Sequence, residues 1–340
     1  MKYVGIDLHK KTITVCVVNK EREILLRRRL ECADAAAIRN FFAGMGEFEA
    51  VVEATASYEW LVRLIEPLAR RVLLAHPKKL RVIAESVRKS DRLDAQVLAE
   101  FLALDLIPTS YRPTPRQRDH RRLVRQRQSL QRRITAVKNK LRRVLSDYNA
   151  DRPDLFTREG AAYLEQITLS AADRFAAEQL QAELAFQQQQ LAAADRQLQA
   201  FAREAPAREA EARALLKSIP GVGDVTTEVV LAELADVRRF RSQKAVVAYA
   251  GLAPGQRESA GKRQELHLEK NGSRLLRWIL VEAAWRLVGQ TARWRAVFDK
   301  LAQHTGRKKA IVAVARRLLG LMMAILQNGQ PYQHGLADAA

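Results

Sequence analysis

Short apolar segments alternate with polar ones along the first third of the chain. Residues 3–7 (YVGID) and 12–18 (TITVCVV) flank a short polar stretch, which predicts a β-hairpin. The predicted strands are residues 3–7, 12–18, 24–30, 50–53 and 72–75. The predicted helices are residues 33–43, 58–70 (with Ser57 as N-cap) and 91–105. Strands followed by alternating strands and helices predict an α/β layer fold for residues 1–110.

A helical period replaces this pattern in the middle of the chain. After Pro113 and Pro115, apolar residues recur at spacings of 7, 4, 3 and 4, which predicts an amphipathic helix that continues beyond Leu145. These residues are Leu123, Leu130, Ile134, Val137 and Leu141. Leucines at 180, 184, 191 and 198 predict a second long helix within residues 160–215, antiparallel to the first. We therefore expect a long antiparallel coiled-coil arm over residues 111–214, suited to dimerisation or spacing.

Two helices joined by the tetrapeptide PGVG (220–223) are predicted next, in a segment similar to a helix-hairpin-helix. Gly221 and Gly223 permit a tight turn, and the N–H groups that begin the second helix can bind a phosphate. A plain turn between two helices is the alternative. With further helices expected at 274–288 and 308–327, we predict a mainly α C-terminal domain over residues 215–332 and a tail at 333–340.

The charge of the chain is concentrated in one segment. The 340 residues carry 58 Lys and Arg against 38 Asp and Glu, a formal net charge of +20. Residues 111–143 alone hold 13 basic residues and one acidic residue. Such an excess is typical of a protein that binds a polyanion, although a solvated face of a coiled coil is the alternative. The candidate nucleic-acid contacts here are Arg121, Arg122, Arg125, Arg132, Arg133, Lys138 and Lys140.

Several classes of protein are disfavoured by the composition. The two cysteines, Cys16 and Cys32, form no CxxC motif, and the six histidines form no HxxxH pair, which argues against a disulfide scaffold or a zinc module. No GxxxxGK[ST] motif supports a P-loop ATPase. The most apolar stretch, 311–326, is interrupted by Arg316 and Arg317, so we expect no membrane span and a cytoplasmic location.

Four carboxylates have the placement of a metal site. Asp7 ends the first predicted strand, Glu53 ends a later strand, and Asp91 and Asp94 share one face of a predicted helix. Hard oxygen ligands suit Mg²⁺, and two such ions about 4 Å apart can clamp a phosphodiester. Each acid also has an ordinary interpretation: strand ends for the first two, and an N-cap with its N3 partner for Asp91 and Asp94.

The segments around these acids resemble a known family. VGIDLHKKTITV, VVEATASYEWL and KSDRLDAQVLAEF are similar to the DEDD transposases of IS110/IS1111 insertion sequences. The resemblance implies an RNase H-like, RuvC-like N-terminal domain. It also implies a catalytic site in which Asp7, Glu53, Asp91 and Asp94 bind one or two Mg²⁺ ions.

A later segment, FRSQKAVVAYAGLAPGQRESAGKRQELHLEKNGSR, extends the resemblance, which places a nucleophilic serine after GLAP. Ser259 and Ser273 are the candidates. Ser273 precedes a predicted helix and is expected to cap it. The resemblance places the nucleophile at Ser259, in a loop beside Arg257, Lys262 and Arg263, whose charges are suited to holding a phosphate.

The resemblance implies a site-specific recombinase that mobilises its own insertion sequence through a covalent phosphoserine. It further implies binding to element ends and target DNA, a non-coding bridge RNA as guide, sites assembled between protomers of a homodimer or homotetramer, and a prokaryotic, nucleoid-associated location. Two alternatives remain: a Mg²⁺-dependent, structure-specific nuclease like a Holliday-junction resolvase, which hydrolyses DNA with water, and a non-enzymatic architectural protein.

Overall fold

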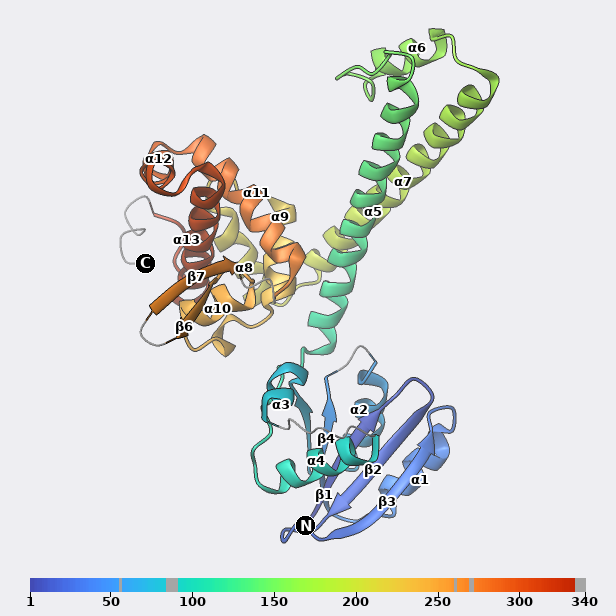
Figure 1. Ribbon diagram of the computed structural model, residues 1–340, viewed down its shortest axis with the longest axis vertical. Helices are drawn as coiled ribbons and strands as arrows, with labels where there is room; N and C mark the ends of the chain where they lie inside the picture. The colour runs from blue at the N-terminus through green and yellow to red at the C-terminus, as the bar shows by residue number, and fades with distance from the viewer. Residues whose placement is uncertain (55–56, 84–90, 260–261, 269–271, 334–340) are drawn as a thin grey trace. The chain divides into compact units, whose positions relative to one another are not determined.

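The computed structural model describes residues 1–54, 57–83, 91–259, 262–268 and 272–333, with side chains outside the description at 81–83, 91–93, 256–259 and 262–267. The chain divides into two compact units, residues 1–112 and 113–340 (Figure 1). The first is built on a mixed sheet, and the second is mostly helical.

A five-stranded sheet in the order β3-β2-β1-β4-β5 forms the centre of the first unit. β1 pairs antiparallel with β2, and β2 pairs antiparallel with β3, while β1 pairs parallel with β4, and β4 parallel with β5. The strands are β1 (Lys2–Leu8), β2 (Thr12–Val18), β3 (Ile24–Glu31), β4 (Phe48–Glu53) and β5 (Arg71–Ala75). All five predicted strands are confirmed, and the buried apolar residues of β1 and β4 place these strands at the centre.

Helices cover both faces of this sheet. They are α1 (Ala35–Ala43), α2 (Glu59–Ile65), α3 (Pro77–Ile83) and α4 (Asp91–Ala103). α1 and α2 share one apolar cluster with β1, β2 and β4, whereas α4 packs on the opposite face. The prediction that Ser57 caps α2 is wrong, because Tyr58 is the N-cap and makes no side-chain capping bond. The helix ends at Ile65 rather than residue 70, since Pro67 has no N–H to continue it.

Gly5 lets α4 approach the backbone of β1 closely. A Cβ atom on Gly5 would lie 2.0 Å from the carbonyl oxygen of Ala95 and 2.4 Å from the amide nitrogen of Ala99. Tyr3, two residues earlier in β1, packs in the same cluster as Ala103, one turn later in α4. α4 therefore runs antiparallel to β1, and its first turn lies toward the carboxyl end of β1.

The second unit begins with two long antiparallel helices, α5 (Pro115–Ser146) and α7 (Ala171–Arg203) (Figure 1). Leu141 lies in one cluster with Ala177, and Ile134 lies in another with Leu184, so residue numbers fall along α5 as they rise along α7. The predicted second long helix is confirmed as α7, which contains all four leucines, but residues 160–215 do not form one continuous helix. The segment is divided into α6 (Arg158–Gln166), α7 and α8 (Ala207–Lys217), because Ser170 caps α7 and Pro206 precedes α8.

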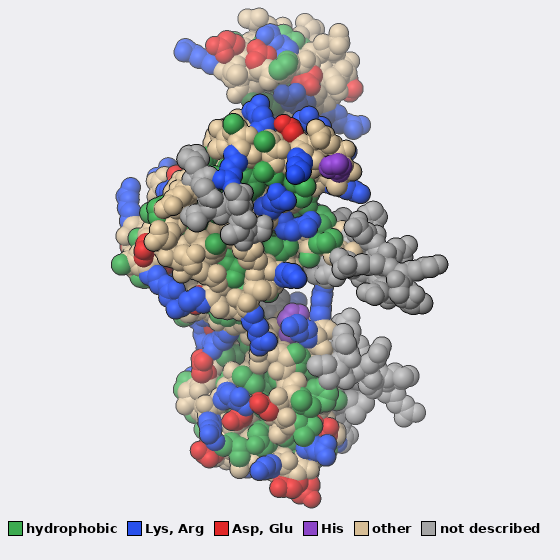
Figure 2. Space-filling model, turned by 90° about the vertical axis from the view of Figure 1, so that its left-hand side faces the viewer, with side chains coloured by type: hydrophobic (Ala, Val, Ile, Leu, Met, Phe, Trp, Pro, Cys, Tyr) green, Lys and Arg blue, Asp and Glu red, His purple; other side chains and the backbone are tan. Residues whose placement is uncertain are grey.

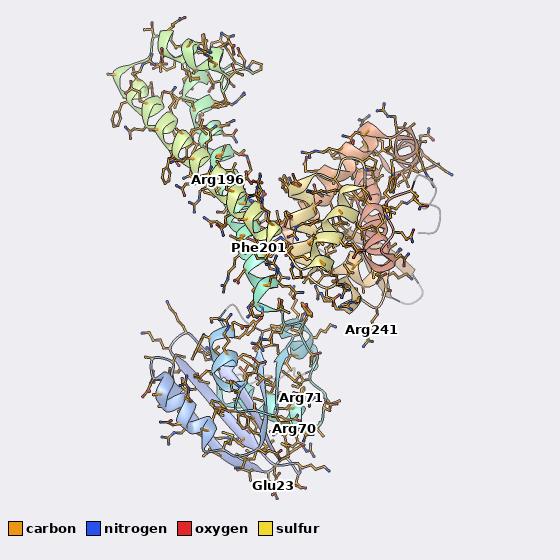
Figure 3. The ribbon with its side chains drawn as sticks, turned by 180° about the vertical axis from the view of Figure 1, so that it is seen from behind. Glu23, Arg70, Arg71, Arg196, Phe201 and Arg241 are labelled. Atoms are coloured by element: carbon orange, nitrogen blue, oxygen red, sulfur yellow. The ribbon has the colours of Figure 1, made fainter. Side chains whose placement is uncertain are left out.

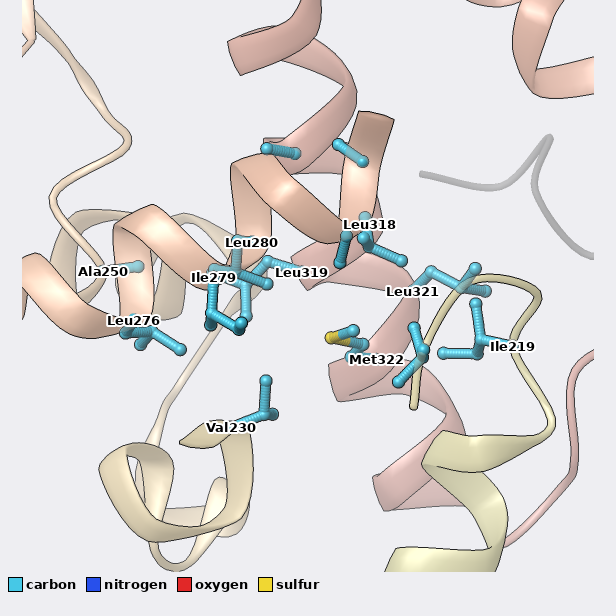
Figure 4. Packing of buried hydrophobic residues seen from close by; sticks show 14 of the residues in the cluster. Ile219, Val230, Ala250, Leu276, Ile279, Leu280, Leu318, Leu319, Leu321 and Met322 are labelled. Carbon is cyan, nitrogen blue, oxygen red and sulfur yellow. The ribbon is translucent and has the colours of Figure 1, made fainter. Parts of the chain in front are cut away.

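The remainder of the second unit packs around one large apolar core (Figure 4). Its elements are α8, α9 (Asp224–Leu234), the 3₁₀ turn η1 (Val237–Arg239), α10 (Gln243–Tyr249), β6 (Pro254–Ser259), β7 (Lys262–Leu268), α11 (Arg274–Gln290), α12 (Ala292–Thr305) and α13 (Arg307–Asn328). The mainly α prediction is confirmed. The loop expected around Ser259 is instead an antiparallel hairpin of β6 and β7.

α13 is long and apolar enough to cross a membrane by length and composition alone. Arg316 and Arg317 do not interrupt it as a helix. Most of its apolar stretch is buried against the rest of the second unit, where Leu318, Leu319 and Met322 join the core. This burial is typical of a core helix.

We expect Gly5→Ala to destabilise the first unit by about 1–3 kcal/mol, because the added methyl group would collide with the α4 backbone. Thermal and urea unfolding followed by circular dichroism measures the change. Gly44→Ala is the matched control: Gly44 has a φ of −73°, and its nearest neighbour to a new Cβ is the Asn40 carbonyl oxygen at 3.5 Å. Equal stability of the two variants would contradict the close approach.

Candidate active site and nucleic-acid interface

Two of the four predicted acids lie at the same edge of the sheet. β1 and β4 are adjacent and parallel, and their last paired residues are Ile6 and Val52. Asp7 and Glu53 each follow directly, so both carboxylates stand at the carboxyl ends of neighbouring strands. Side chains two residues apart share a face of a strand, and Gly5 and Val51 face α4. Asp7 and Glu53 therefore lie on the α4 face.

Asp7 is held in place by a neighbour that the sequence analysis did not single out. The Asp7 side chain is largely buried, and its Oδ2 lies 2.9 Å from Nε2 of His9. Because an ionised carboxylate only accepts hydrogen bonds, the His9 ring donates to it. The His9 amide donates to the carbonyl of Thr12 at 2.9 Å, which fixes the turn between β1 and β2. His9 lies two residues after Asp7, and this short spacing is the sequence signal that could have identified it as a partner of Asp7.

The other two acids lie in the first turns of α4. α4 begins at Asp91, which therefore lies inside the helix rather than at its N-cap, and Asp94 is exposed. The side chain of Asp91 is outside the described residues. Since α4 runs antiparallel to β1, its first turn lies toward the end of the sheet that carries Asp7 and Glu53.

The chemistry of this edge suits a hard cation. Carboxylate oxygens are the ligands that Mg²⁺ prefers. Among the side chains that the structure describes, no three His, Cys, Asp or Glu residues are close enough to hold a metal ion together. The fourth acid, Asp91, is not among those side chains. The donors thus fit a divalent cation in type, and their strand ends and the first turn of α4 lie toward one edge of the sheet.

Ser259 is the last residue of β6 and is paired with Lys262 in the register of the β6–β7 hairpin. Arg257 is paired with Gln264, and Arg263 with Glu258. The side chains of Ser259, Arg257, Lys262 and Arg263 lie outside the described residues. Ser273, the competing serine, accepts a hydrogen bond from the amide of Leu276 at 3.2 Å, so its predicted role as the N-cap of α11 is confirmed.

The PGVG turn between α8 and α9 has a shape suited to backbone contacts. Gly221 has a φ of +78°, and a Cβ atom there would lie 2.9 Å from Cβ of Arg286. Gly223 is the N-cap of α9, with nothing within 4 Å of a new Cβ. A shallow hollow of about 360 Å³ lies over this turn and is also lined by Lys217, Arg286 and Gln290. Sequence analysis found the two glycines and missed Lys217 and Arg286, which lie outside the motif.

Two predicted nucleic-acid contacts on α5 have internal partners. Arg125 donates to both carboxylate oxygens of Glu233 at 2.9 and 3.1 Å, and only 1% of the Glu233 side chain is exposed. This hydrogen bonding raises the pKa of Arg125 above its usual value. Arg121 donates to the carbonyls of Ala232 and Glu233. Both arginines thus attach α5 to α9, a role that sequence analysis did not anticipate.

A second set of buried charges lies where α5 meets α8 and α9. The Glu228 carboxylate lies 2.6 Å from Nε2 of His120 and accepts from Arg213 at 2.7 Å. Burial by itself would raise the pKa of Glu228, but hydrogen bonds from His120 and Arg213 outweigh it and hold that pKa below its usual value. The ring of Phe201, labelled in Figure 3, stacks on His120 and lies 3.9 Å from the guanidinium carbon of Arg116.

Four of the five remaining predicted contacts on α5 are exposed, and Lys138 is partly buried. Lys138 lies over the ring of Phe156 at 4.5 Å. Arg122 lies 3.5 Å from Asp119, and both side chains are mostly exposed. The exposed residues Arg132, Arg133 and Lys140 have no ion pair with any side chain that the structure describes. Figure 2 shows that Lys and Arg side chains also spread over one face of the second unit.

Family comparisons agree with this arrangement. A transposase model of the DEDD, IS110 type matches residues 4–150, which contain the acidic edge of the sheet. The model of the transposase IS116/IS110/IS902 family matches residues 213–299, which contain the PGVG turn, the β6–β7 hairpin and α11. The chain is therefore a transposase, an enzyme that acts on DNA, and its DEDD domain implies metal-dependent catalysis.

Relatives match along nearly the whole chain. A transposase for insertion sequence element IS1111A from Coxiella burnetii is 26% identical, over 98% of this chain and 92% of that protein. A transposase for IS1328 from Yersinia enterocolitica is 25% identical, over 96% of this chain and 97% of that protein. A pilin gene-inverting protein from Moraxella bovis is 30% identical over 35% of this chain and 38% of its own length. The chain belongs to the IS110/IS1111 family of insertion-sequence transposases.

We expect Arg125→Ala to lower the free energy of unfolding by about 1–3 kcal/mol, because it leaves the buried Glu233 carboxylate without its cationic partner. Arg132→Ala, on the same helix but exposed, should change stability by less than about 0.5 kcal/mol. Chemical denaturation measures both. Adding Glu233→Gln to Arg125→Ala should restore part of the loss, and a loss no larger than that of Arg132→Ala would contradict the structural role.

Proposed function

We propose that the chain cuts and rejoins DNA through a covalent phosphoserine on Ser259, assisted by Mg²⁺ at Asp7, Glu53, Asp91 and Asp94. The main support is that the carboxyl ends of β1 and β4 and the first turn of α4 lie toward the same edge of the sheet. Asp7 and Glu53 follow a register pair on adjacent parallel strands, and α4 directs its first turn toward the same edge. The strand order β3-β2-β1-β4-β5 supports an RNase H-like, RuvC-like fold for this domain.

The four carboxylates would hold one or two Mg²⁺ ions. Bound there, Mg²⁺ supplies a Lewis acid that polarises the scissile phosphate. His9 keeps Asp7 in one orientation by donating to its Oδ2, and the buried position of Asp7 excludes water from one side of the carboxylate. These residues prearrange negative charge at one edge of the sheet.

Ser259 would act as the nucleophile. Its Oγ forms a bond to phosphorus while the bond from phosphorus to the leaving strand oxygen breaks, and the serine proton passes to that oxygen. The strand is rejoined when a strand hydroxyl attacks the phosphoserine and Oγ regains a proton. A neutral serine hydroxyl is a poor nucleophile, so this step needs activation. Arg257, Lys262 and Arg263 belong to the same hairpin, and their charges suit a phosphate.

The proposed domain division assigns residues 1–110 to the acidic site, 111–214 to the arm and 215–332 to the serine domain. The PGVG turn, with Gly221 and Gly223, would contact the DNA backbone. The exposed Arg132, Arg133 and Lys140 on the arm suit the phosphate backbone of a nucleic acid. The family resemblance suggests a non-coding bridge RNA as a further partner. The serine and the acids belong to different compact units, and we propose that protomers of a dimer or tetramer bring them together in shared sites.

Covalent trapping tests the serine step. Full-length protein, with co-purifying RNA retained, is incubated with labelled DNA that spans the element ends and Mg²⁺, and products are separated on a denaturing gel. We expect a protease-sensitive band shifted by the 38.4 kDa of the protein, absent in Ser259→Ala. Ser273→Ala, which removes a helix cap, is the matched control and should retain the adduct.

Free cleaved DNA without an adduct would overturn the serine proposal. If that cleavage were lost in Asp7→Ala and retained in Ser259→Ala, the chain would act as a Mg²⁺-dependent nuclease that uses water.

Mixing two inactive variants tests whether protomers share sites. Asp7→Ala lacks a metal ligand, and Ser259→Ala lacks the nucleophile, so each alone should be inactive. If the acids of one protomer serve the serine of another, co-purified mixtures should recover part of the adduct yield, measured on the same gel. No recovery at any ratio would contradict shared sites, provided size-exclusion chromatography shows that the variants assemble together.

A further inference from the structure

α11 presents two tryptophans on the surface of the second unit. Trp278 is 43% exposed and Trp285 is 38% exposed, while Ile279, Leu280 and Ala284 between them are buried in the core. Residues seven apart lie two turns apart on one face of a helix. The ring of Trp285 lies 5.3 Å from that of the buried Phe298, which supports it from beneath. This face is thus an aromatic surface on a firmly packed helix.

Positive charge borders the two rings. Arg274 precedes Trp278 by one turn, Arg286 follows Trp285 directly, and both are exposed. Neither has a hydrogen bond or an ion pair with another side chain in the described part of the chain. Glu282, four residues after Trp278 and three before Trp285, lies on this face between the rings, and it is the one acidic residue of α11 against three arginines. Such a combination favours a ligand that offers both flat rings and negative charge.

The same face is continuous with the PGVG turn. The backbone of Gly221 packs directly against Arg286, and Arg286 lines the shallow hollow over the turn together with Lys217. At its other end, α11 starts six residues after β7 ends at Leu268. The helix therefore follows the hairpin of Ser259 in the chain and ends beside a turn suited to phosphates.

We propose that the α11 face binds an unpaired DNA strand, with bases stacked on Trp278 and Trp285 and phosphates held by Arg274 and Arg286. Two helical turns separate the rings by about 10.5 Å along the axis. Stacked bases rise only about 3.4 Å per nucleotide along a strand. Two bases that stack on the two tryptophan rings must therefore lie further apart than neighbouring stacked bases. An unpaired strand permits this separation and a duplex does not.

We assign this face to DNA, because a transposase breaks DNA strands and must hold the strand that is released. This requirement holds whether the strand is released by a serine or by water. Strand binding by α11 therefore does not depend on the phosphoserine mechanism. Base stacking is also tolerant of sequence, since every base offers a flat ring.

The test uses the full-length protein and a labelled single-stranded DNA of about 15 nucleotides. Fluorescence anisotropy measures the Kd, and quenching of tryptophan fluorescence reports stacking directly. We expect Trp278→Ala and Trp285→Ala each to weaken binding about 5- to 100-fold, while Trp278→Phe and Trp285→Phe retain most of it. Phe186→Ala on α7, where Phe186 is 56% exposed, is the matched control and should leave binding unchanged.

A second pair of variants does not touch the aromatic packing. Arg274→Gln and Arg286→Gln are surface changes that should each reduce the dependence of log Kd on log salt by about one unit of slope. The same measurements with a duplex of that sequence should show little effect of the tryptophan variants. Equal weakening of single-stranded and duplex DNA would overturn the proposal of an unpaired strand.

Two further outcomes assign the face to other partners and would overturn the proposal. If the tryptophan variants weaken binding of single-stranded RNA of the same sequence but not of DNA, the face is an RNA site. If they leave both nucleic acids unaffected but reduce the molecular mass measured by analytical ultracentrifugation, the face is a contact between copies of this chain. Unchanged binding and unchanged mass would exclude any role in recognition.

Discussion

The close contact between α4 and β1 at Gly5 determines the candidate acidic site. Only a residue without a side chain allows the α4 backbone to lie this near the strand, where a Cβ would be 2.0 Å from the Ala95 oxygen. The contact fixes the position and direction of α4 on the sheet. Its first turn, with Asp91 and Asp94, consequently lies toward the edge that carries Asp7 and Glu53. The close packing of α4 on Gly5 in the core thus positions the candidate metal-binding acids at the edge of the sheet.

In the second unit, buried carboxylates fix the position of a helix, as Gly5 does in the first unit. Glu228 and Glu233 on α9 are almost fully covered, and a buried charge is tolerated only when it is paired. His120, Arg125 and Arg213 provide the pairing and join α5 to the helices around the PGVG turn. The basic helix therefore has two regions: a base whose arginines hold the fold together, and a distal part whose cations are exposed.

The face of α11 connects features that the chain keeps apart. The PGVG turn precedes the β6–β7 hairpin by some thirty residues, and α11 follows the hairpin, yet Gly221 packs against Arg286. The helix is held by the core through Leu276, Leu280 and Leu287, so its exposed aromatic and basic side chains rest on a rigid support. The residues proposed to bind an unpaired strand thus lie on one helix that is fixed by the core.

The sequence alone determined the elements whose pattern is local: the five strands, the long α5, the two helices joined by PGVG and the cap at Ser273. It also singled out the four acids and two glycines as candidates, because their spacing and neighbours carry the signal. Only the tertiary structure decided that Arg121 and Arg125 bind to α9, that His9 holds Asp7, and that Arg286 joins the PGVG turn. These facts depend on residues far apart in the chain, such as Glu233 and Arg125, whose pairing results from packing and leaves no periodic trace in the sequence.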